Sequence, residues 1–159
     1  SYRRALAIDE NAVGPHHPRI AARLNSLGLA MRAQGRLVDA HQALDRALRV
    51  ILAASVSAPS EVANIRTNLG IILQEMERKS EARAQFDAAL AGEELAFGAG
   101  HQSVGLRLNI LAGRFEMMGD LAGAHAAYAR ALAILEKSLP PHHPRVVALQ
   151  QGLARTARA

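Results

Sequence analysis

Along most of the chain, apolar residues recur three and four positions apart, which places them on one face of an α-helix. Residues 20–31 (IAARLNSLGLAM) and 40–51 (AHQALDRALRVI) show this spacing clearly. Segments with glycine or charged residues, such as GRLVD at 35–39 and GDLAG at 119–123, separate the apolar stretches. The pattern therefore predicts helices joined in pairs by short turns, and no strands.

The helical pattern repeats every 42 residues with no insertion or gap. At each step the residue type is conserved along the chain. The clearest series are Tyr2, Leu44, Phe86 and Tyr128; Ala5, Ala47, Ala89 and Ala131; Leu27, Leu69, Leu111 and Leu153; and Gly28, Gly70, Ala112 and Ala154. A constant period of this length indicates a stacked array of helical hairpins, each of which buries its apolar face against its neighbours.

The pentapeptide PHHPR occurs twice, at 15–19 and 141–145, three periods of 42 apart. Paired histidines raise the possibility of a metal site, and these are His16, His17, His142 and His143. Adjacent residues in a turn do not share a helix face, and no carboxylate cluster accompanies them, as a zinc site would require. We therefore interpret the motif as the end of one hairpin and the start of the next.

Three features of the repeat carry a family resemblance. They are a small residue in helix one (Gly28, Gly70, Ala112), a turn glycine (Gly35, Gly119), and a helix-two signature (Ala40, Leu44, Ala47; Ala82, Phe86, Ala89; Ala124, Tyr128, Ala131). This combination resembles the tetratricopeptide repeat, and the 42-residue unit with its His-Pro opening resembles the kinesin-light-chain type. The resemblance implies an all-α fold, a right-handed α-solenoid of antiparallel helix pairs. Glu77 replaces the turn glycine in the second unit, so we expect a different turn there.

The repeats divide residues 1–159 into a single array. Residues 1–14 match the later part of a helix two, followed by repeats at 15–58, 59–100 and 101–141, and then by helix one of a further repeat, or a capping helix, at 142–159. We expect the chain to be a piece of a longer array. Exposed apolar surface on its terminal helices would favour self-association.

Composition narrows the function classes. The chain has no cysteine, which excludes disulfides and thiolate metal sites. It has no apolar run of about 18 residues and no visible signal peptide, so we expect a soluble protein without membrane association and take the cytoplasm as its compartment. The compartment of the parent protein is left open. The Arg- and Ala-rich composition favours a bacterial source.

A net charge of +5 raises nucleic-acid binding as an alternative. The longest Lys/Arg run is Arg3-Arg4, and aromatic residues are only 3% of the chain, so stacking side chains are scarce. We therefore disfavour nucleic acid as a partner. The sequence also shows no nucleophile motif and no phosphate-binding glycine loop, so we predict no enzymatic activity, no cofactor and no bound metal.

In the resembled family, helix-one side chains line a concave surface that holds a peptide or a helix. The matching residues here are Asn25, Ser26, Leu29, Arg32, Asn64, Thr67, Asn68, Ile71, Gln74 and Asn109. Asparagine suits this role because its amide offers donors and an acceptor to a peptide backbone. Arg32, with Arg23 or Arg107 at the rim, would pair with an acidic ligand. Alternatively, Asn25 and Asn109 make hydrogen bonds between helices.

The sequence thus predicts a module within a larger protein that binds a peptide or protein segment, whose identity stays open. Two alternatives remain. The array is a structural spacer or oligomerisation module, or it is the sensor domain of a multidomain signalling protein.

Overall fold

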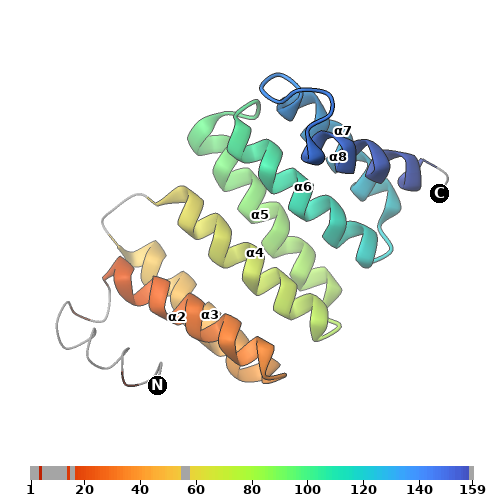
Figure 1. The fold of residues 1–159 in the computed structure, drawn as a ribbon. Coiled ribbons are helices and arrows are strands. Elements are labelled where there is room, and N and C mark those ends of the chain that lie inside the picture. The colour runs from red at the N-terminus through yellow and green to blue at the C-terminus, as the bar shows by residue number, and fades with distance from the viewer. Residues whose placement is uncertain (1–3, 5–13, 15–16, 55–57, 158–159) are drawn as a thin grey trace. The chain divides into compact units, whose positions relative to one another are not determined.

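The computed structural model describes Arg4, Gly14 and residues 17–54 and 58–157, and every regular element in these residues is an α-helix (Figure 1). In chain order they are α2 (Pro18–Ala33), α3 (Leu37–Ala53), α4 (Pro59–Glu75), α5 (Lys79–Phe97), α6 (Gln102–Met117), α7 (Leu121–Leu135) and α8 (Pro144–Thr156). The predicted all-α helical repeat solenoid is confirmed. The helix two expected within residues 1–14, like His16, lies outside the described residues, and the repeat boundaries stay predictions.

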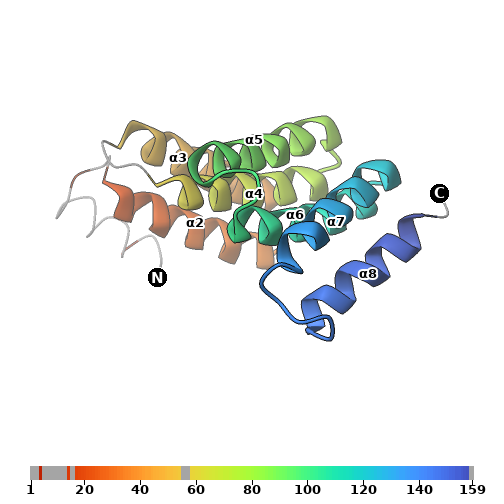
Figure 2. The same cartoon turned by 90° about the horizontal axis from the view of Figure 1, so that it is seen from above.

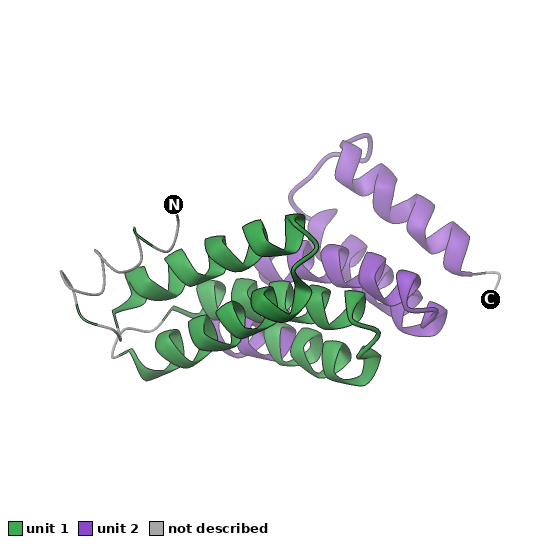
Figure 3. Ribbon diagram, turned by 90° about the horizontal axis from the view of Figure 1, so that it is seen from below, with its two compact units in different colours: residues 1–89 green, residues 90–159 purple. Residues whose placement is uncertain are grey.

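The chain forms two compact units, Ser1–Ala89 and Leu90–Ala159, whose boundary falls inside α5 (Figure 3). In unit 1, α3 packs against both α2 and α4, and α2 also touches α4. In unit 2, α7 packs against both α6 and α8, and α8 also touches α6 (Figure 2). Within each unit, a helix therefore packs mainly against the next helix along the chain, as stacked hairpins require.

Each hairpin of unit 1 is closed by a large side chain that packs against a glycine. A Cβ added at Gly28 would lie 2.8 Å from Leu44 Cγ, and one added at Gly70 would lie 2.5 Å from Phe86 Cε1. Both distances are too short for a real Cβ. Leu44 and Phe86 are fully buried. In these two hairpins the small residue of helix one and the large residue of helix two are therefore in a close contact that a Cβ at the glycine would prevent.

The turn at Glu77 is not the different turn expected from its sequence. Glu77 has a φ of 60°, close to the 74° of Gly35. The hydrogen bonds also match: Glu77 N–H bonds to Gln74 O and Arg78 N–H to Leu73 O, as Gly35 N–H bonds to Arg32 O and Arg36 N–H to Met31 O. The second hairpin thus uses the same left-handed helix C-cap as the first, although glutamate is sterically less favourable than glycine in this conformation.

Histidine side chains cap three of the helix-one helices. The Nδ1 atom of His17 accepts from Arg19 N–H at 3.1 Å, and that of His143 accepts from Arg145 N–H at 3.2 Å. His101, outside the PHHPR motif, caps α6 in the same way through Ser103 N–H. The interpretation of PHHPR as the opening of a helix is confirmed for His17 and His143, because each satisfies a backbone donor left without a partner at a helix start.

We predict that Glu77→Gly stabilises the protein by about 0.5–1 kcal/mol, since glycine adopts the left-handed conformation without a steric penalty. Glu77→Ala, which keeps a Cβ, should give no such gain. The ion pair lost in both variants, Lys79 Nζ to Glu77 Oε2 at 3.8 Å, is exposed and contributes little. Urea unfolding of the three proteins measures the difference, and equal stability of the glycine and alanine variants would contradict the prediction.

We predict that His143→Ala lowers the free energy of unfolding by about 1 kcal/mol through loss of the α8 cap. His142→Ala is the matched control, because its side chain is exposed and does not cap the helix. His143→Asn should restore most of the loss, since asparagine is a good capping residue. Thermal unfolding followed by circular dichroism compares the variants. A loss as large in His142→Ala would show that the motif acts in another way.

Candidate functional site

Two side-chain contacts link α2 to α4 in unit 1. Asn68 Nδ2 donates to Asn25 Oδ1 at 2.9 Å. Seven residues farther along both helices, which is about two helical turns, Arg32 bonds to Glu75. Arg32 Nε donates to both carboxylate oxygens of Glu75 at 2.9 Å, and Arg32 Nη2 also contacts Oε1. These four residues, which we name the α2–α4 face, are half-buried or partly exposed. The hydrogen bonds to Glu75 raise the pKa of Arg32.

The Asn25–Asn68 bond leaves hydrogen-bonding capacity on both side chains. Asn68 uses one of its two amide protons, and Asn25 uses its oxygen as acceptor. The NH₂ group of Asn25 and the carbonyl oxygen of Asn68 make no further bond within the described part of the chain. The bond therefore holds the two amides close together, while a donor group of Asn25 and an acceptor of Asn68 stay available.

The other predicted groove residues of unit 1 have different environments. Ser26 is exposed, but its hydroxyl donates to Ala22 O at 3.1 Å; Leu29 and Asn64 are also exposed. Thr67 and Ile71, by contrast, are 4% and 8% exposed, and Thr67 donates to Ala63 O at 2.8 Å. Their burial means that these two residues present almost no surface to a ligand, contrary to the sequence interpretation.

Gln74, Asn109 and the two rim arginines complete the predicted set. Gln74 is half-buried, and its Oε1 is a buried acceptor with no hydrogen-bond partner among the described residues. Asn109 is half-buried on α6, in unit 2. Arg23 is exposed on α2, whereas Arg107, expected at the rim, is 7% exposed and paired with Glu93. Arg107 is therefore a buried residue, which corrects its placement.

On α6 of unit 2, two of the positions equivalent to the α2–α4 face are apolar. Ile110 and Met117 on α6 occupy the positions of Asn68 and Glu75, one 42-residue period later, and they are 45% and 70% exposed. Gly113, at the position of Ile71, carries no side chain between them. The sequence analysis did not select Met117 as a surface residue of helix one. Its position in the repeat, 42 residues after Glu75, was the signal that could have done so.

Glu116 of α6 connects this helix to α7 and α8. Its carboxylate accepts from Arg155 Nε of α8 at 3.0 Å and from the Tyr128 hydroxyl of α7 at 2.9 Å. The hydrogen bonds from Arg155 and then Tyr128 lower the pKa of Glu116. Burial, followed by the bond to Glu116, raises the pKa of Tyr128. The charged form of Glu116 therefore stabilises the attachment of α8.

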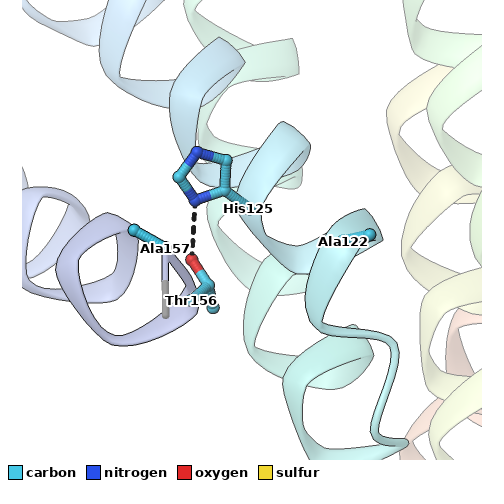
Figure 4. A pocket seen from close by; sticks show the side chains of 4 residues that line it. All are labelled: Ala122, His125, Thr156 and Ala157. Carbon is cyan, nitrogen blue, oxygen red and sulfur yellow. Dashed lines mark hydrogen bonds between the residues drawn. The ribbon is translucent and has the colours of Figure 1, made fainter. Parts of the chain in front are cut away.

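A pocket of about 410 Å³ lies between α7 and α8, lined by Ala122, His125, Thr156 and Ala157 (Figure 4). The Thr156 hydroxyl donates to Gly152 O at 2.8 Å, and its Oγ1 lies 3.0 Å from His125 Nδ1.

The described residues contain neither a metal-binding cluster nor a membrane-spanning helix. No three His, Asp or Glu side chains there are placed to hold a metal ion together. No helix in the same part of the chain is both long and apolar enough to cross a membrane.

Comparison with known proteins identifies the protein family. The family model described as "Tetratricopeptide repeat" matches residues 1–53 and 61–137. Tetratricopeptide repeat protein 19, mitochondrial, is 31% identical in Homo sapiens and 33% identical in Rattus norvegicus, each over 94 residues and 59% of this chain. The chain spans about a quarter of the length of these relatives, with 24% and 25% of them covered.

Solved structures agree on the fold. The crystal structure of BtubC (BKLC) from P. vanneervenii matches 99% of this chain and 63% of its own with a TM-score of 0.83 and 20% identity. A putative kinesin light chain from Podosopora anserina with nearly identical TPR-like repeats matches 99% of this chain and 74% of its own with a TM-score of 0.80 and 22% identity.

The fold defines a helical repeat protein of the kind that generally serves protein–protein interaction and is typically non-enzymatic. The chain belongs to the tetratricopeptide repeat family, and its repeats share the fold of kinesin-light-chain-like repeats. The resemblance inferred from the 42-residue period is confirmed.

We predict that Glu116→Gln lowers the free energy of unfolding by about 1 kcal/mol at pH 7, and that this difference disappears at acidic pH. Because the folded-state pKa of Glu116 is lowered from 4.5, its contribution is fully present above about 4.5 and is lost as the pH falls through the folded-state value. Urea unfolding at pH values between neutral and strongly acidic measures the effect.

Glu136→Gln provides the control for this experiment, because Glu136 is exposed at the end of α7 and makes no ion pair within the described residues. Its substitution should leave stability unchanged at every pH. A difference between wild type and Glu116→Gln that persists at acidic pH would contradict the assigned role of the carboxylate.

Proposed function

We propose that the chain binds an extended peptide segment of a protein partner on the α2–α4 face of unit 1 and performs no catalysis itself. The observation that carries the proposal is the Asn25–Asn68 pair, which holds the two amides close together and keeps one donor group and one acceptor available. An extended peptide presents alternating N–H and C=O groups, so one residue of a ligand can satisfy both amides. The exposed Leu29 on α2 supplies apolar contact nearby.

The charge of α2 favours an acidic ligand. This helix carries Arg19, Arg23 and Arg32 and no acidic residue. Arg32 already bonds to the Glu75 carboxylate, which shows that its guanidinium is oriented for a carboxylate at this face. A ligand carboxylate that joins or replaces Glu75 would meet the same planar donor arrangement. The proposed partner segment is therefore an extended peptide with at least one Asp or Glu.

The test begins by selecting ligands from a phage-displayed library of random peptides on the immobilised chain. We expect the selected peptides to be enriched in Asp and Glu and their affinity to fall with added salt. Asn68→Ala and Arg32→Ala should each weaken binding by about 5- to 10-fold, the loss of one or two hydrogen bonds. Fluorescence polarisation with the labelled peptide gives the dissociation constants.

Gln42→Ala is the matched control, because Gln42 is an exposed amide on α3, outside the α2–α4 face. The Gln42→Ala variant should bind the labelled peptide as tightly as the wild type does. Melting temperatures of all variants separate loss of binding from loss of fold. If Asn68→Ala and Arg32→Ala fold normally and bind as tightly as Gln42→Ala, the α2–α4 face is not the binding site.

A further inference from the structure

One buried pair of positions in the repeat carries opposite charges, whereas the same positions one period before and one period after are apolar. Glu93 and Arg107 are 2% and 7% exposed, and Arg107 Nη2 donates to Glu93 Oε1 at 2.9 Å. Arg107 Nε donates to the second carboxylate oxygen at 3.2 Å. Both residues belong to unit 2, where Glu93 lies near the end of α5 and Arg107 near the start of α6.

One period of 42 residues earlier, the same two positions hold Ile51 of α3 and Ile65 of α4; one period later they hold Leu135 of α7 and Leu149 of α8. All four are buried, with exposed fractions of 2% or less. They lie on helices that pack together, α3 on α4 and α7 on α8. The position therefore belongs to the packing of helix two on the next helix one, and among the junctions of the described residues the one between α5 and α6 is charged. Two periods before Glu93 and Arg107 the sequence has a second pair of opposite charge, Asp9 and Arg23, of which Asp9 lies outside the described residues.

Stability alone does not explain the exchange of an apolar pair for ions. Desolvation of two charges opposes their attraction, and a well-packed apolar pair of similar volume is as stabilising or more so. The two neighbouring junctions show that this fold accommodates such a pair. The ion pair must therefore contribute something that isoleucine or leucine would not, and that property is discrimination between partners.

Repeated helices create the need for discrimination. Because the packing positions are similar at every junction, α5 has a competitor to α6 in α8, and α6 has a competitor to α5 in α3. In the first wrong pairing Glu93 would face Leu149, and in the second Arg107 would face Ile51. Either pairing buries one of the two charges away from the other, which is strongly unfavourable. Of these three pairings, only that of α5 with α6 keeps the two charges together. The ion pair does not discriminate in this way against α2, which carries Arg23 at the position of Arg107.

We propose that the Glu93–Arg107 ion pair determines which helices pack together: it directs α6 onto the end of α5 and excludes α3 and α8, of the same chain or of a second copy, whose equivalent residues are apolar. The pair acts by penalising wrong pairings during folding, when helices from different repeats compete. The proposal concerns assembly of the array and is independent of any ligand.

The test is refolding of a variant in which Leu replaces both residues, Glu93→Leu with Arg107→Leu, as at Leu135 and Leu149. The protein is unfolded in urea, refolded by dilution over a range of concentrations, and analysed by sedimentation velocity. We expect a melting temperature at or above that of the wild type and a several-fold larger fraction of dimers and larger species after refolding. Since the chain contains no cysteine, disulfide exchange does not contribute to these species.

Two further variants identify the cause. Exchange of the charges, Glu93→Arg with Arg107→Glu, keeps an ion pair in the buried position and should refold to monomer like the wild type. Glu93→Gln removes the carboxylate that pairs with the buried Arg107 and should lower the melting temperature by roughly 10 °C. A second apolar variant, Glu93→Ile with Arg107→Ile, repeats the test with the pair found at Ile51 and Ile65.

The proposal is overturned if both apolar variants refold to the same monomer fraction as the wild type. It is equally overturned if they melt well below the wild type, because the pair would then serve stability. The proposal would also be contradicted if the charge-exchanged variant folds but associates like the leucine variant.

Discussion

The structure depends on the close approach of two helices at positions without a side chain. At Gly70, the ring of Phe86 occupies the space that a Cβ would need, and Leu44 does the same at Gly28. The same contact extends to α8, where a Cβ added at Gly152 would lie 2.7 Å from the Tyr128 ring. Because these contacts fix the spacing of neighbouring helices, they set the positions of all the other side chains on those helices.

The surface positions of helix one differ between the two units. In unit 1 they carry Asn25, Asn68 and an ion pair between Arg32 and Glu75. In unit 2 the positions of Asn68 and Glu75 hold Ile110 and Met117, which are 45% and 70% exposed, whereas the positions of Asn25 and Arg32 hold the polar residues Asn109 and Glu116. Repeated packing and variable surface chemistry are thus separated within one 42-residue repeat.

The interior is not uniform either. Glu93 and Arg107 place a complete ion pair at a position that is apolar one repeat before and after. Glu93 and Arg107 discriminate against helices that carry an apolar residue at this position, whereas isoleucine and leucine tolerate many neighbours. Within the described residues, a selective contact thus stands beside apolar contacts that supply cohesion.

The sequence by itself determined the helices, the hairpin pairing and the alternation of small and large residues, because these follow from local spacing that recurs with a fixed period. It also identified the helix starts at His17 and His143, where a side chain bonds to the backbone two residues on. Tertiary structure decided the burial of Thr67 and Ile71, although Asn25 and Asn109, at the position of Thr67, are only half-buried. It decided the pairing of Arg107 with Glu93, fourteen residues away on another helix. It also held Glu77 in a left-handed conformation that its own preference opposes. In each case the outcome depends on a neighbouring helix, and periodicity within one helix carries no information about what packs against it.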